Sequence, residues 1–207
     1  MVFIYYEGDL LMRLLWIALL ALCVLLTYHT CSNREISRPP GVLAAEEPVQ
    51  TPVTDLPEIA YGAYRLRPLA GFDIKARVIL AKRYWFGRGS DLAPVDLALG
   101  WGPMSDQDVL KQFTFSQSDR FYYWRTDTFP VPRETVESHS ANMHMIPANP
   151  EIESELKRLR PGHIVQVRGY LVEAHGPDGG RWTSSLSRTD TGRGACEIVF
   201  VQSLNIN

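Results

Sequence analysis

Cys196 is the residue with the clearest capacity for chemistry. It follows the glycine-rich stretch Gly192-Arg193-Gly194-Ala195, and a cysteine can act as a nucleophile when a neighbouring base activates it. The candidate bases are His175 and His139. The alternative is a small apolar side chain on the inner face of the last strand, because free cysteines are often buried. The sequence favours this packing role, so we assign no catalytic residue.

Two histidines in the segment 138–144, SHSANMH, are candidate metal ligands. His139 and His144 could bind zinc together with a carboxylate, and the methionines on either side of His144 would suit copper(I). Their spacing of five residues fits neither the i, i+4 pair of a helix nor the i, i+2 pair of a strand. We therefore expect a hydrogen-bonded loop or strand edge, and no metal or other cofactor.

A polar run, residues 184–193, is the best candidate for a ligand-binding loop. Its sequence SSLSRTDTGR combines arginines, hydroxyls and glycine, although such groups can also satisfy one another within a tight loop. The aromatic run 121–124 is a second candidate surface, and core packing is its alternative. The predicted ligand contacts are Arg188, Thr189, Asp190, Arg193, Tyr123 and Trp124.

Basic and aromatic residues alternate between positions 64 and 88. On a small β-barrel such a face could hold single-stranded nucleic acid, and beside a membrane it could attract anionic lipid. A solvated strand face with extended Lys and Arg side chains is the simplest interpretation. We expect no nucleic-acid partner, because the N-terminal segment predicts a location outside the cytoplasm.

Composition narrows the function classes. The chain has 207 residues, 45% hydrophobic residues and a net charge of −2, which indicates one folded domain plus a tail and argues against a strongly basic nucleic-acid coat. Three cysteines are too few for a disulfide-stapled miniprotein. Nucleotide-binding loops, dinucleotide fingerprints, serine-hydrolase elbows, HExxH and CxxC motifs are absent from the sequence.

The N-terminal segment is the most specific local signal. Leu14–Leu26 contains thirteen residues without a polar group, and Arg13 precedes it. Signal-peptide cleavage, lipidation at Cys31 and an uncleaved anchor are the alternatives. We expect an uncleaved anchor in membrane lipid, with the rest of the chain outside the cytoplasm, in the periplasm of a Gram-negative cell. Translation could start at Met1 or at Met12.

The rest of the chain divides at a change in composition. Residues 1–31 form the predicted anchor, 32–60 a proline-rich extended linker, and 61–207 a globular domain. Within that domain we expect strands at 72–86, 95–101, 120–126, 163–174, 181–187 and 195–203. We expect helices at 105–113 and 149–160, the second capped by Asn149.

This order of elements predicts a mainly β fold. A late helix within an antiparallel meander is typical of a β-barrel that is OB-like in plan, with two short helices, preceded here by the N-terminal hydrophobic helix. The alternative is an α+β sandwich with the helices on one face of the sheet.

The motifs SHSANMH (138–144), GYLVEA (169–174) and SSLSRTDTGRGACEIVFV (184–201) carry a resemblance. Over roughly residues 95–203 the chain resembles a family of uncharacterised, membrane-anchored bacterial proteins. The resemblance implies a location and an architecture, and no activity. Cys196 and His175 are also similar to the Cys–His pair of L,D-transpeptidases, but Arg193-Gly194-Ala195 stands where that family has Ser-His-Gly.

Together these features predict a single-pass, membrane-anchored binding or assembly module outside the cytoplasm, working with an envelope protein as partner. One alternative is a cell-envelope enzyme that uses Cys196 as nucleophile. The other is a nucleic-acid-binding OB-like domain, which requires a cytoplasmic location.

Overall fold

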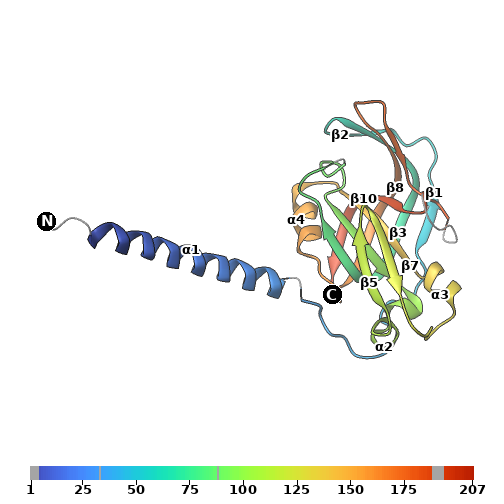
Figure 1. Ribbon diagram of the computed structural model, residues 1–207. Helices are drawn as coiled ribbons and strands as arrows, with labels where there is room; N and C mark the ends of the chain where they lie inside the picture. Colours follow the sequence, from blue (N-terminus) through green and yellow to red (C-terminus); the bar gives the residue numbers. More distant parts are fainter. Residues whose placement is uncertain (1–4, 33, 88, 188–193) are drawn as a thin grey trace. The chain divides into compact units, whose positions relative to one another are not determined.

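The computed structural model of the chain describes residues 5–32, 34–87, 89–187 and 194–207. The chain divides into two compact units, residues 1–35 and residues 36–207. The first unit consists of the N-terminal helix, and the described strands all belong to the second (Figure 1).

The first unit is a single helix, α1, which spans Tyr5–Ser32. The window Leu10–Thr27 has 18 residues and a mean hydropathy of 2.5, and none of it is buried against the rest of the chain. This window rises about 27 Å, close to the roughly 30 Å apolar thickness of a bilayer. The Thr27 hydroxyl donates to the Cys23 carbonyl, which satisfies it within the helix. The predicted apolar helix is confirmed, and its length suits a membrane anchor or a signal sequence.

The second unit is mainly β, as predicted. Its strands are β1 Val49–Pro52, β2 Ile59–Tyr61, β3 Tyr64–Arg83, β4 Val95–Gly100, β5 Thr114–Ser118, β6 Phe121–Arg125, β7 Ser140–Pro147, β8 Ile164–His175, β9 Arg181–Thr183 and β10 Glu197–Ile206. Its helices are α2 Gln107–Leu110, α3 Arg133–Ser138 and α4 Pro150–Arg158, with a 3-10 turn, η1, at Gly102–Ser105. The short helix α3 is an addition to the two helices predicted for this part of the chain.

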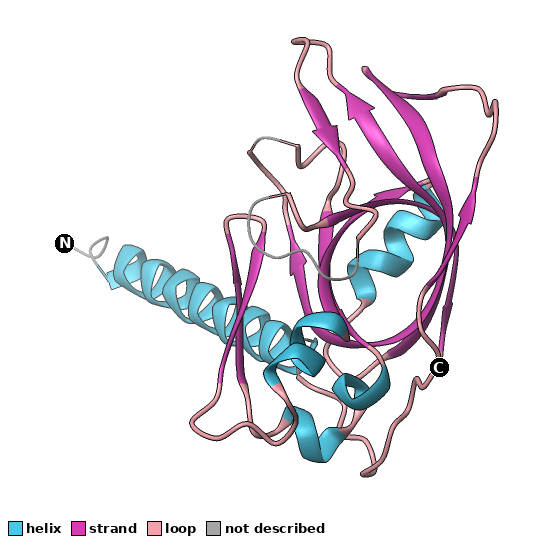
Figure 2. Cartoon of the chain, turned by 90° about the vertical axis from the view of Figure 1, so that its right-hand side faces the viewer, coloured by secondary structure: helices cyan, strands magenta, loops and turns pink. Residues whose placement is uncertain are grey.

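The pairing of five strands leads back to its starting point. β3 pairs antiparallel with β4, β4 with β7, β10 with β8 and β8 with β3, while β7 and β10 run parallel. β3 is both the first and the last strand of this order, because its 20 residues are long enough to pair with two strands. Residues 77–83 pair with β4, and residues 65–77 pair with β8. Figure 2 shows these strands curving round a common interior.

The interior is filled by alternate residues of the strands and by one helix. On β3, Phe72, Ile74 and Ala76 are buried in one hydrophobic cluster of the second unit, which we call the main core. Their spacing is the two-residue period of a strand. α4 adds Ile152, Leu156 and Leu159 to the same core. The predicted cap is present, because Asn149 Oδ1 accepts a hydrogen bond from the Ile152 amide at 2.9 Å.

Residues 34–60 differ from the predicted extended linker. The Ile36 amide donates to the Pro161 carbonyl at 2.9 Å, Ala44 is fully buried, and β1 pairs with residues 70–73 of β3. Proline is compatible with this arrangement because β1 lies at the edge of the sheet, where a missing amide donor is tolerated. The second unit therefore begins at Ile36 rather than near residue 61.

Candidate functional site

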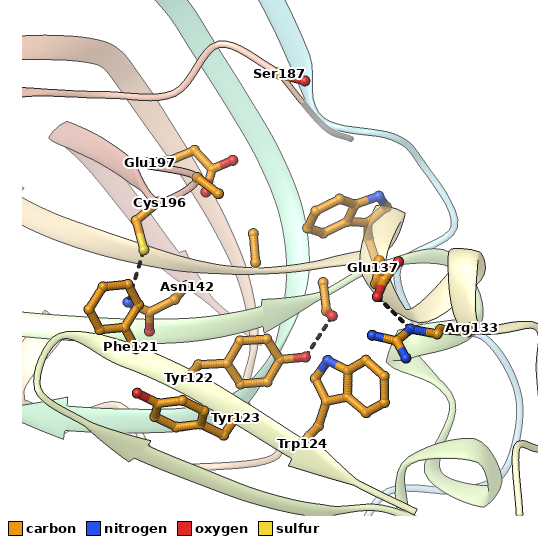
Figure 3. Close-up of a pocket in the computed structure, with 14 residues that line it drawn as sticks. Phe121, Tyr122, Tyr123, Trp124, Arg133, Glu137, Asn142, Ser187, Cys196 and Glu197 are labelled. Carbon is orange, nitrogen blue, oxygen red and sulfur yellow. Dashed lines mark hydrogen bonds and ion pairs between the residues drawn. The ribbon is translucent and has the colours of Figure 1, made fainter. Parts of the chain in front are cut away.

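A cavity of about 510 Å³ opens beside the small β5–β6 sheet (Figure 3). We call it the aromatic pocket, because four consecutive residues of β6, Phe121–Trp124, form one wall. The other walls come from α3, from β7 and from the start of β10. The remaining lining residues are Trp101, Arg133, Glu137, Ser140, Ala141, Asn142, Ser187, Ala195, Cys196 and Glu197.

The aromatic wall is held by a tight hairpin. Asp119 and Arg120 connect β5 to β6 with φ values of 52° and 69°, as in the two-residue turns whose twist matches that of the strands. Trp124 packs edge-on against Phe113 at 6.0 Å between ring centroids. Tyr123 is left 50% exposed at the mouth of the pocket. The hairpin thus leaves the Tyr123 ring half exposed, while Tyr122 and Trp124 pack against a buried hydrophobic cluster.

The opposite wall supplies polar groups. Arg133 and Glu137, one turn apart on α3, form an ion pair of 2.8 Å from Nε to Oε1, and the Arg133 guanidinium lies 5.6 Å from the Trp124 ring centroid. The hydroxyls of Tyr122 and Ser140 are 2.7 Å apart, and burial raises the pKa of Tyr122. The pocket therefore combines flat apolar faces with charged and neutral hydrogen-bonding groups.

Cys196 lies in the wall of this pocket and is half-buried. Its sulfur is 4.0 Å from Asn142 Nδ2 and 4.0 Å from the Arg120 carbonyl oxygen. Asn142 is held in turn by Gln117, whose Nε2 donates to Asn142 Oδ1 at 2.7 Å. Cys196 is thus half-buried in the pocket wall, with its sulfur beside an amide group and a backbone carbonyl.

The predicted ligand contacts fall into two groups. Tyr123 and Trp124 line the aromatic pocket, whereas Arg188, Thr189, Asp190 and Arg193 lie outside the described residues. The described neighbours of that loop, Ser187 and Ala195, line the same pocket. The structure therefore brings described residues on either side of positions 188–193 to the predicted aromatic surface, a relationship that the sequence did not indicate.

The three candidate histidines each contact a different carboxylate. His139 Nε2 is 3.0 Å from Glu47 Oε1, and its Nδ1 faces the Thr135 carbonyl at 3.0 Å. His175 Nε2 is 2.8 Å from Glu173 Oε1, and His144 Nδ1 is 2.8 Å from Asp96 Oδ1. Over the described part of the chain, no group of three or more His, Cys, Asp and Glu is placed to hold a metal ion.

Sequence reasoning missed a buried polar cluster around Asp96. The Asp96 side chain is fully buried and contacts both Arg120 Nη1 and His144 Nδ1 at 2.8 Å. The Arg120 guanidinium lies 3.7 Å from the Tyr84 ring centroid, and burial, followed by the charge of Asp96, raises the pKa of Tyr84. These residues are far apart in sequence, so no local motif could have revealed the cluster.

A second cavity, of about 560 Å³, borders this cluster through Arg120 and Trp182. The Trp182 ring lies 4.4 Å from the His144 ring, centroid to centroid. Most of the other lining residues are apolar or belong to the turn 176–180. Compared with the aromatic pocket, this cavity has fewer polar groups facing one another.

Comparison of the chain with protein-family models, curated proteins and solved structures returned no match.

Proposed function

We propose that the protein is a single-pass membrane-anchored module that binds a ligand outside the cytoplasm, with the aromatic pocket as its site. α1 supports the anchoring, because its apolar window has the length of a bilayer core and is not buried against the chain. The aromatic pocket supports the binding role, because rings, an ion pair and neutral polar groups face one cavity. In this proposal membrane lipid is one partner through α1, and an envelope protein is another.

We also infer that the second unit is OB-like. The returning order β3-β4-β7-β10-β8, with β7 and β10 parallel, supports a closed five-stranded barrel. α4 lies between β7 and β8 in the chain and packs into the main core, where it would close one end of the barrel. OB-folds bind oligonucleotides or oligosaccharides on one face and through two loops.

The ligand class that suits the aromatic pocket best is a short saccharide. The exposed ring of Tyr123 and the neighbouring Trp124 offer flat apolar faces of the size of a sugar ring. The Arg133–Glu137 pair offers donors and acceptors to hydroxyls while keeping its own charges balanced. The cavity volume lies within the range of known small-molecule sites. The single observation that carries this proposal is one cavity lined both by the aromatic residues of β6 and by the Arg133–Glu137 ion pair.

The test is titration of the full chain in detergent micelles with N-acetylglucosamine oligomers and maltose oligomers, followed by tryptophan fluorescence. We expect binding by at least one series, with a tenfold or greater loss of affinity in Tyr123→Ala. Phe86→Ala is the matched control, because Phe86 is 91% exposed and does not line the pocket. Absence of binding at millimolar concentrations, or equal affinities of both variants, would overturn the saccharide proposal.

A cell-envelope enzyme remains the second candidate, favoured by the position of Cys196 in the wall of the same pocket. A cysteine enzyme needs a base that reaches the sulfur, and the two candidate bases, His139 and His175, contact Glu47 and Glu173. Loss of a measured activity in Cys196→Ala with retained saccharide affinity would favour the enzyme. A nucleic-acid-binding OB-like domain is the third candidate, and it requires a cytoplasmic location.

A further inference from the structure

One edge of the second unit exposes two large aromatic side chains next to a group of cations. Trp85 and Phe86 follow the end of β3 and are 66% and 91% exposed. The ammonium group of Lys157, in the last turn of α4, lies 5.0 Å from the Trp85 ring centroid. Arg83 Nη2 donates to the Leu159 carbonyl at 3.3 Å. These contacts join residues 82–86 and 157–160 into one surface, which we call the basic-aromatic edge.

The charge of this edge is positive. Lys82, Arg83, Lys157, Arg158 and Arg160 lie within its two segments, and neither segment contains an Asp or Glu. Nearby carboxylates reduce this charge only in part: Glu153 pairs with Lys157, Asp91 borders a small cavity with Trp85, and Asp96, opposite Lys82 in the β3–β4 register, pairs with Arg120. Lys82 and Arg158 are exposed to solvent. Exposed cations beside exposed aromatic rings suit the interface of an anionic bilayer.

The chain that connects α1 to the second unit is short. α1 ends at Ser32, and the Ile36 amide already donates to the Pro161 carbonyl at 2.9 Å. Pro161 directly follows the basic-aromatic edge. Four Cα–Cα steps separate Ser32 from Ile36, which limits their distance to about 15 Å.

The attachment at Ile36 is tight. A Cβ on Gly162 would lie 2.1 Å from the Ile36 carbonyl oxygen, and Gly162 has a φ of +92°. Only glycine fits there without strain. The chain between α1 and the attachment at Ile36 is therefore too short to act as a long tether.

We propose that the basic-aromatic edge docks on the anionic surface of the membrane that holds α1, with Trp85 and Phe86 entering the headgroup region. The occupant is the bilayer itself, because the short connection to the chain's own anchor keeps the second unit within reach of it and the two charges are complementary. Docking would give the protein a second contact with the membrane, in addition to α1, and would fix the orientation of the aromatic pocket. This inference rests on the anchoring part of the proposed function.

The experiment uses the full chain in vesicles, with all three native cysteines replaced by alanine and an environment-sensitive fluorophore on Phe86→Cys. Leu56→Cys is the matched control, because Leu56 is 42% exposed and lies outside the basic-aromatic edge. In vesicles with phosphatidylcholine and phosphatidylglycerol at about 7:3, we expect a nitroxide on the lipid chains to quench the label at position 86 at least twofold more than the label at position 56. Added Lys82→Glu and Arg158→Glu substitutions should abolish the difference, as should vesicles of phosphatidylcholine alone.

Each other outcome has a defined meaning. Equal quenching at both positions in protein that resists carbonate extraction would overturn the docking proposal and leave the anchor intact. Extraction of the protein by carbonate would instead overturn the anchor. A label at position 86 that is shielded from lipid nitroxide and from aqueous iodide alike would show a protein partner or a second copy on this surface, and would also overturn docking on lipid.

Discussion

Arg120 and Asp96 form an ion pair of 2.8 Å between Nη1 and Oδ1 that joins the β5–β6 hairpin to β4. The Asp96 side chain is fully buried and that of Arg120 is 18% exposed, so water does little to screen the pair. The same Arg120 amino group donates to the Ala93 carbonyl at 2.8 Å. Because the hairpin carries the aromatic wall, this ion pair also holds one side of the aromatic pocket in place.

Replacing Arg120 by methionine should destabilise the second unit by about 3 kcal/mol. The substitution keeps much of the side-chain length but leaves the Asp96 carboxylate buried beside His144 and Tyr84 without a guanidinium partner, and an uncompensated buried charge is costly. Urea unfolding followed by near-ultraviolet circular dichroism measures the effect.

Arg133→Met is the control for this prediction. It removes an ion pair of the same length, 2.8 Å, whose arginine is 69% exposed, and should cost less than about 1 kcal/mol. The double variant Arg120→Met/Asp96→Asn should recover part of the stability, because it removes the buried charge as well. Similar losses for Arg120→Met and Arg133→Met would show that the Arg120–Asp96 pair is not structurally important.

The sequence predicted local features better than long-range ones. α4 could be predicted because its cap, its charges and its apolar spacing all lie within twelve residues. β7 could not, because Asn142 and His144 interrupt the apolar pattern that marks a buried strand. Their polar groups are satisfied by Gln117 and Asp96, residues that only the folded chain brings near.

In the candidate site, too, single residues could be predicted from the sequence, whereas their arrangement could not. Tyr123, Trp124 and Cys196 were each recognised by residue type, but their common pocket depends on the pairing of β6, β7 and β10 with their neighbours. The Arg133–Glu137 ion pair gave no signal, because an i, i+4 ion pair on a six-residue helix resembles any solvent-exposed turn. Composition can thus suggest the groups, whereas the fold determines which of them meet.

Glu173 should make the stability of the second unit depend on acid pH. Its side chain accepts hydrogen bonds from Arg67, Thr183 and His175, and these bonds, that of Arg67 first, lower its pKa from 4.5 to about 2. The ionised form is therefore favoured in the folded state. Its contribution is fully present above pH 4.5 and is lost as the pH falls from 4.5 towards 2.

The check is a comparison of Glu173→Gln with the original chain by urea unfolding between pH 2 and pH 7. We expect Glu173→Gln to be about 2 kcal/mol less stable at pH 7, because hydrogen bonds to a charged group are lost or weakened. The difference in unfolding free energy between Glu173→Gln and the original chain should shrink to near zero as the pH approaches 2. Glu58→Gln, at an exposed position, should show no such trend. A difference that stays constant with pH would contradict the role assigned to the Glu173 charge.

Cys196 should report both the location of the second unit and the accessibility of the aromatic pocket. It lines the pocket and is half-buried, so a maleimide should reach it in the folded protein, more slowly than it reaches an exposed cysteine.

In a variant with Cys23 and Cys31 replaced by alanine, a membrane-impermeant maleimide should label Cys196 in intact spheroplasts. A saccharide that occupies the pocket should slow this labelling several-fold, and Leu56→Cys, at a position that is 42% exposed and lies outside both the pocket and the basic-aromatic edge, provides the reference rate in a background without Cys196. Labelling that requires permeabilised membranes would place the second unit in the cytoplasm and favour the nucleic-acid alternative. Labelling that requires denaturation would make Cys196 a core residue and remove the cysteine enzyme from consideration.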